Sequence, residues 1–214
     1  MATLLTGLCV DVPAKRRVFF SFHYQHDIHR VNQVRNSWRF RRESEREAYG
    51  FFDASLWERS KRQGDDSLKS LIREGMANSS VTCVLAGEHT WQRRWVRYEI
   101  ARSIVKGNGL LTVMIHGVKN LDGHISPEGP NPLDHVGVYR VPDGRLLLAE
   151  TNAQGQWVQY RDYTQAVILP AGWEQPGGLI PIPLSRYAAR YDYAFNGYEN
   201  FGSWVAAAAS AAVR

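Results

Sequence analysis

The first half of the chain alternates between short apolar runs and longer stretches in which apolar residues recur every three or four positions. The apolar runs are rich in β-branched and aromatic residues, which is typical of strands covered on both faces of a parallel sheet. The predicted strands cover residues 17–22, 50–54, 80–86 and 110–115. The predicted helices cover residues 28–38, 66–76 and 96–106, and Gly107 is a suitable C-cap for the last of them. Because crossovers between parallel strands are right-handed, this order predicts an α/β fold with a doubly wound, mostly parallel sheet.

After Gly117 the pattern changes to a loop rich in glycine and proline, followed by shorter elements. Short strands are predicted over residues 136–141, 146–150 and 156–160, an extended proline-containing segment over 169–183, and a terminal Ala-rich helix over 200–213. Phe201 and Trp204 are the expected anchors of that helix. No flexible linker separates the two halves. We therefore expect a core over 14–117 and a C-terminal extension over 118–214 that packs on the core and is not an independent domain.

Composition and charge narrow the class of protein. Hydrophobic residues make up 44% and charged residues 22% of the 214 residues, which is the balance of a soluble globular protein. The formal net charge of +5 suits an anionic ligand such as a dinucleotide. The sequence lacks the stripe of basic and aromatic residues that is typical of nucleic-acid-binding proteins, which disfavours that class. No apolar run approaches the roughly 18 residues that span a membrane. Cys9 and Cys83 fit neither a disulfide framework nor a metal site, so we expect a cytoplasmic protein.

Three polar segments follow the predicted strands. They are Ser21–Asp27, Asp53–Glu58 and Gly87–Glu99. Because the carboxyl ends of parallel strands meet at one edge of the sheet, where open α/β sheets bind ligands, we expect the functional site there. Phe22 and His23 end the first strand and either line a nucleotide pocket or pack against the strand end. Asp53 is a candidate for binding a ribose hydroxyl, with capping of its own loop as the alternative.

Trp95 and Glu99 are the sharpest candidates for chemistry. They are four residues apart at the start of the third predicted helix, and on a helix this spacing puts them on one face, one turn apart. A carboxylate beside an indole is partly desolvated and acts strongly on a nearby positive charge. The alternative is a surface glutamate paired with Arg102, with the tryptophan in the core. Spacing alone leaves both interpretations open.

Histidines at positions 23, 26 and 29 are spaced by three residues. No carboxylate or cysteine completes a site at the spacing that metal ligands require, so we expect exposed histidines and no metal. A phosphoacceptor protein of the receiver type is also disfavoured. Such a protein needs clustered aspartates at the end of its first strand, where this chain has Phe22, His23 and Tyr24.

Several long stretches resemble a known family. They are residues 17–25, 52–58, 80–85, 93–100, 129–132 and 201–204. Together they resemble TIR domains and, more narrowly, the TIR-like ThsB family of the Thoeris anti-phage system. The resemblance covers nearly the whole chain from Lys15, whereas residues 1–12 fall outside it. It implies a TIR/flavodoxin-like form of the doubly wound sheet.

The resemblance also implies an activity. Members of this family cleave NAD as a substrate, with no other cofactor, and make a cyclic ADP-ribose isomer on infection. That isomer activates a separate effector, ThsA, and an unidentified phage component is the trigger. The family's catalytic glutamate falls on Glu99, and the aromatic of the same motif falls on Trp95. Ser55, Trp57 and Lys61 lie in the loop that TIR domains use for ligand gating and for self-association on activation.

The chemistry of NAD cleavage agrees with a carboxylate at position 99. Nicotinamide is a cationic leaving group, and its departure leaves an oxocarbenium-like ribose, as in glycoside hydrolysis. A fixed carboxylate stabilises that charge by about 3 kcal/mol if it acts like other preorganised groups. Cyclisation additionally requires a nucleophile from the adenosine side and exclusion of water. The alternative function is a TIR interaction module that recruits partners without catalysis.

Overall fold

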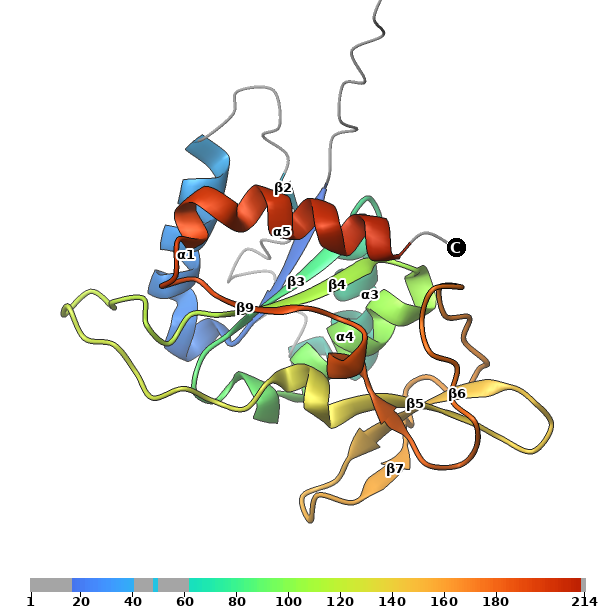
Figure 1. Ribbon diagram of the computed structural model, residues 1–214. Helices are drawn as coiled ribbons and strands as arrows, with labels where there is room; N and C mark the ends of the chain where they lie inside the picture. Colours follow the sequence, from blue (N-terminus) through green and yellow to red (C-terminus); the bar gives the residue numbers. More distant parts are fainter. Residues whose placement is uncertain (1–16, 41–47, 50–61, 213–214) are drawn as a thin grey trace, which may run out of the picture.

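The computed structural model of the protein describes residues 17–40, 48–49 and 62–212 (Figure 1). The predicted strand over 50–54 lies outside the described residues, and so do Asp53, Ser55, Trp57 and Lys61. No helix in the described part of the chain is both long enough and apolar enough to cross a membrane.

A parallel sheet forms the centre of the molecule (Figure 1). Within the described ranges it has five strands in the order β2-β1-β3-β4-β9, and every neighbouring pair is parallel. The strands are β2 (Ala48–Tyr49), β1 (Val18–Phe22), β3 (Val81–Ala86), β4 (Gly109–Met114) and β9 (Arg190–Asp192). The prediction of a doubly wound, mostly parallel α/β sheet is confirmed.

Helices cover both faces of this sheet. They are α1 (Tyr24–Phe40), α3 (Asp65–Met76), α4 (Arg94–Lys106) and α5 (Gly197–Ala211). Side chains alternate along β1, because successive residues of a strand point to opposite faces. Val18 and Phe20 pack with α1 and α5, whereas Phe19 packs with α3 and α4. The helix predicted to end at Gly107 does so, with that glycine in the left-handed conformation at φ 83°.

Helix α1 begins earlier than predicted. The predicted helix starts at residue 28, but the observed helix already starts at Tyr24, and the amide of Asp27 donates to the carbonyl of His23 at 3.0 Å. An acidic residue in the first turn interacts favourably with the positive end of a helix, which explains why this polar stretch is helical.

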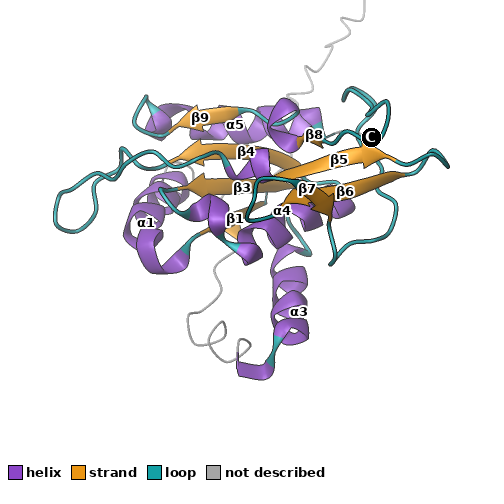
Figure 2. Ribbon diagram, turned by 90° about the horizontal axis from the view of Figure 1, so that it is seen from below, coloured by secondary structure: helices purple, strands orange, loops and turns teal. Residues whose placement is uncertain are grey.

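The second half of the chain adds an antiparallel sheet with strand order β7-β6-β5-β8 (Figure 2). Its strands are β5 (Val136–Arg140), β6 (Leu146–Thr151), β7 (Trp157–Gln159) and β8 (Ile182–Pro183), and the first three match predicted strands. Short 3-10 helices lie at η1 (Thr90–Gln92), η2 (Pro132–His135) and η3 (Leu184–Arg186). Buried residues of β5 and β6 share one apolar cluster with Ile100 and Ile104 of α4.

The C-terminal segment also completes the parallel sheet. Strand β9 pairs with β4, and Tyr191 of β9 stacks on Trp204 of α5 with ring centroids 4.4 Å apart. Phe201 is 1% exposed and stacks on Phe20 of β1. Both predicted anchors of the terminal helix therefore pack on the sheet.

Candidate functional site

The carboxyl ends of β1 and β3 form the position at which an open α/β sheet binds ligands. These two strands are neighbours, but the chain leaves them in opposite directions, from β1 through α1 toward β2 and from β3 through α4 toward β4. Such a reversal of strand order is a topological switch point, and it leaves a crevice between the two connections. In flavodoxin-like sheets, which share the order 2-1-3-4, the ligand binds at this place.

Glu99 lies on the inner face of α4 and reaches the end of β1. Glu99 is 6% exposed, and the hydroxyl of Ser21 donates a hydrogen bond to its Oε2 at 2.5 Å. Ser21 itself is fully buried. The interpretation of Glu99 as a surface residue paired with Arg102 is therefore wrong, because burial and the bond to β1 place its carboxyl group inside the fold beside the switch point.

Burial governs the ionisation of Glu99. It raises the pKa of this carboxyl group to about 8, because the charged form loses its hydration, and the hydrogen bond from Ser21 opposes the shift only in part. At neutral pH the carboxyl group of Glu99 is therefore mostly protonated. A cation that enters the site favours ionisation and is in turn stabilised by the carboxylate.

We expect this raised pKa to make the stability of the protein fall with rising pH. Between the ordinary glutamate pKa of 4.5 and about 8, the folded state binds more protons than the unfolded state, so stability decreases as the pH rises. The free energy of unfolding of Glu99→Gln minus that of the native chain should rise by roughly 2 kcal/mol between pH 6 and 8.5.

Urea titrations at several pH values measure this difference. Glu74→Gln, which removes an exposed glutamate of α3, is the matched control and should show no such trend. A constant difference between Glu99→Gln and the native chain across this range would contradict the burial of an ionisable group at position 99.

Trp95 contacts the core on the α3 side of α4. Its ring packs edge-on against Tyr98 with centroids 5.8 Å apart, and it adjoins the cluster that contains Phe19 and Ile72. The guanidinium of Arg94 lies over the indole at 4.8 Å. Trp95 is half-buried and packs where α4 meets α3. This packing agrees with the alternative expectation of a tryptophan in the core.

The two candidate residues at the end of β1 have different environments. Phe22 is half-buried and packs on the face of the sheet covered by α1 and α5, opposite to Glu99. His23 is 6% exposed, and its ring centroid lies 4.8 Å from that of His26. The expectation of exposed histidines is correct for His26 and His29 and wrong for His23. Among the described residues, no group of three or more potential ligands is arranged to hold a metal ion.

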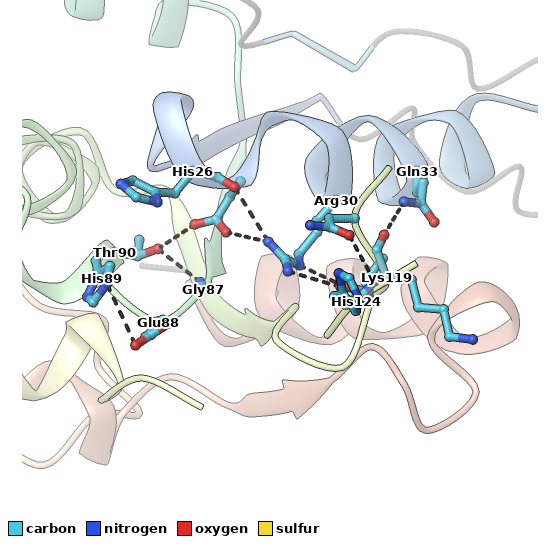
Figure 3. Close-up of polar contacts among 12 residues, drawn as sticks. His26, Arg30, Gln33, Gly87, Glu88, His89, Thr90, Lys119 and His124 are labelled. Carbon is cyan, nitrogen blue, oxygen red and sulfur yellow. Dashed lines mark hydrogen bonds and ion pairs between the residues drawn. The ribbon is translucent and has the colours of Figure 1, made fainter. Parts of the chain in front are cut away.

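A buried ion pair that the sequence reasoning missed joins the segments around the site (Figure 3). Asp27 in the first turn of α1 is 2% exposed, and its Oδ1 lies 3.6 Å from a guanidinium nitrogen of Arg30. The hydroxyl of Thr90 donates to the other oxygen of Asp27 at 3.4 Å and accepts from the amide of Gly87 at 2.9 Å. Burial raises the pKa of Asp27, and Arg30 opposes that shift.

The same arginine reaches the loop after β4. Its Nε donates to the carbonyl of Val118 at 2.8 Å, and a terminal nitrogen donates to the carbonyl of His124 at 3.3 Å (Figure 3). The i, i+3 spacing of Asp27 and Arg30 is the sequence signal for this pair, but it applies only within a helix, and the predicted helix began after Asp27. The network holds the start of α1, the end of β3 and the loop after β4 in one arrangement.

Arg97, which lies between Trp95 and Glu99 in the chain, holds the segment that precedes α4 in place. Its Nε donates to the carbonyl of Trp91 in η1 at 3.1 Å, and a terminal nitrogen donates to the carbonyl of Thr151 in β6 at 2.6 Å. Trp91 in turn stacks on His135 of η2 with centroids 4.7 Å apart. The segment between β3 and α4 is therefore tied to the antiparallel sheet.

The chain is similar to a known family and to a named bacterial protein. The family model described as Thoeris protein ThsB, TIR-like domain, matches residues 19–120. The chain is also 44% identical to a protein of Bacillus cereus (strain MSX-D12) named "Putative cyclic ADP-D-ribose synthase ThsB1". The alignment spans 192 residues and covers 89% of this chain and 98% of that relative. The matched region contains β1, β3, α4 and β4, and hence the elements around the switch point.

Proposed function

Because the chain belongs to the family of Thoeris ThsB proteins with a TIR-like domain, we propose that it cleaves NAD at the bond between nicotinamide and ribose. The observation that carries the proposal is the buried carboxyl group of Glu99, bonded to Ser21 beside the switch point. NAD is the substrate in this reaction, and no further cofactor takes part.

The geometry of Glu99 suits the charge that moves during this reaction. Nicotinamide carries its positive charge while bound to ribose, and the charge passes to an oxocarbenium-like ribose as the bond breaks. A buried carboxylate stabilises that cation more strongly than an exposed one, because little water screens it. The hydrogen bond from Ser21 holds one carboxylate oxygen and leaves the other for the ribose.

The raised pKa of Glu99 couples ionisation to substrate binding. The carboxyl group, with a pKa of about 8 in the free protein, gives up its proton more readily once the nicotinamide cation lies nearby. Binding of NAD and formation of the catalytic carboxylate thus favour each other.

A cyclic ADP-ribose isomer is the product that we propose, as a signal that activates the Thoeris effector ThsA after an unidentified phage trigger. The name of the Bacillus cereus relative supports a cyclic product. Cyclisation requires the adenine side of the bound ADP-ribose to reach the ribose cation before water does. A TIR module that only recruits partners has no use for a buried carboxyl group that costs stability, which favours the enzyme over that alternative.

Mass spectrometry of extracts from phage-infected cells tests the product. Cells that carry the chain should accumulate nicotinamide together with a compound of the mass of ADP-ribose minus one water, and cells without the chain should contain neither above background. Accumulation of linear ADP-ribose in place of the dehydrated compound would show that the chain hydrolyses NAD and does not cyclise it. Unchanged NAD and nicotinamide during infection would refute the proposal.

A further inference from the structure

A cluster of histidine side chains comes from the segments after β1 and β3, on both sides of the switch point. These histidines have no role in the bond cleavage proposed above. His23 follows β1, His26 lies in the first turn of α1, and His89 follows β3. The ring of His26 is 4.8 Å from that of His23 and 5.6 Å from that of His89. Figure 3 shows His26 and His89 on either side of Thr90, at one end of the network around Asp27.

His23 has an unused polar atom. The residue is 6% exposed, and its Nδ1 is buried with no hydrogen-bond partner in the described part of the chain. A buried polar atom without a partner costs free energy, which a ligand that supplies the missing hydrogen bond recovers. The pKa of His23 is lowered to about 4, first by burial and then by the positive charge of Arg93, with smaller effects from His26 and His89. Burial disfavours a charge on this imidazole, whereas the positive charge of Arg93 repels a further cation and attracts an anion.

Helix α1 begins directly after His23, and helix α4 begins directly after Arg93. The amides that precede Asp27 at the start of α1 have no acceptor inside the helix, and the same holds for the amides that precede Arg97 at the start of α4. The start of α4 has no side-chain cap and no acidic residue in its first turn. The positive end of the α4 dipole therefore adds to the charge of Arg93.

The acidic groups near this cluster leave its positive character intact. Asp27 is bonded to Thr90 and paired with Arg30, so its charge is compensated locally. Glu88 lies 3.7 Å from Nε2 of His89, but both side chains are about two-fifths exposed and water screens their interaction.

We propose that His23, His26, His89 and Arg93 form a binding site for the diphosphate group of the dinucleotide substrate. The assignment to the substrate rests on the proposed function, whereas the preference for a diphosphate rests on the cluster itself. Ser21, which holds Glu99, precedes His23 by two residues in the chain. One ribose and its 5′ carbon separate the scissile bond of NAD from its diphosphate, so an anion site for the substrate must lie close to Glu99, and the position of His23 just beyond Ser21 agrees with this requirement.

Isothermal titration of the full chain with inorganic pyrophosphate tests the site. His23→Gln, and separately the double variant His26→Gln with His89→Gln, should each weaken pyrophosphate binding about tenfold or more, since each removes hydrogen bonds to a charged group. His29→Gln, an exposed histidine on the same helix, is the matched control and should bind within about twofold of the native chain. His26 is exposed, so the double variant keeps the test valid if His23→Gln unfolds, as melting curves will show.

Two further arms separate this inference from the proposed function. Glu99→Gln should retain pyrophosphate binding, and ADP-ribose should displace pyrophosphate from the native chain. No pyrophosphate binding by the native chain, or equal binding by the native chain and the folded histidine variants, would overturn the anion site whatever the activity toward NAD. Failure of ADP-ribose to compete would overturn its assignment to the substrate. Histidine-dependent binding in a chain that never cleaves NAD would leave the anion site standing and remove the proposed function.

Discussion

Replacing Gly87 by alanine is expected to destabilise the protein by about 4 kcal/mol or more. A Cβ atom at this position would lie 2.4 and 2.5 Å from the two carboxylate oxygens of Asp27, far inside van der Waals contact. The carboxylate has no room to retreat, because Asp27 is 2% exposed and held by Arg30 and Thr90. The added methyl group must therefore break the buried ion pair or displace the end of β3.

Thermal melting measures this effect. Gly87→Ala should melt about 10 °C or more below the native chain, given the size of the protein. Gly172→Ala is the matched control, because a Cβ there meets nothing within 4 Å and the glycine does not have a positive φ. Similar melting temperatures for the two variants would show that Asp27 and Gly87 are not in close contact.

The sequence was sufficient to predict β1, β3 and β4 of the central sheet and the helices that cover them. Short apolar runs such as β3 and β4, with their β-branched residues, indicate strands covered on both faces, and every residue of both strands is buried. Strand β9 was missed, since three residues with Arg190 and Asp192 at the ends carry no apolar pattern. Its pairing depends on the edge of β4, which is a tertiary feature.

The candidate site was predictable in part. Helical spacing placed Glu99 and Trp95 on α4, but it did not indicate that the carboxyl group would bond to Ser21 of β1. Alternation along a strand puts Ser21 and Phe22 on opposite faces of the sheet. The face on which α4 packs decides which of the two side chains meets Glu99. The burial of His23 likewise depends on how α1 and the segment after β3 come together, which no local pattern encodes.

Substitution of Glu99 by glutamine is expected to have the largest effect on activity. Glutamine keeps the size of the side chain and an oxygen that accepts from Ser21, but it carries no negative charge at any pH. Stabilisation of the ribose cation is then lost in a site where burial makes it strong. We expect nicotinamide release from NAD to fall by about a thousandfold, in line with the loss of other preorganised electrostatic groups.

The fold should survive this change. A neutral amide avoids the cost of ionising a buried group, so Glu99→Gln should be at least as stable as the native chain above neutral pH. Loss of activity would therefore not reflect unfolding, and Glu74→Gln controls for the removal of a glutamate elsewhere on the chain.

The most direct measurement compares nicotinamide release from NAD by the native chain, Glu99→Gln and Glu74→Gln, each isolated from phage-infected cells at equal protein concentration. We predict rapid release by the native chain and by Glu74→Gln, and release near background by Glu99→Gln. Release by Glu99→Gln at the native rate would contradict the catalytic role of the buried carboxylate.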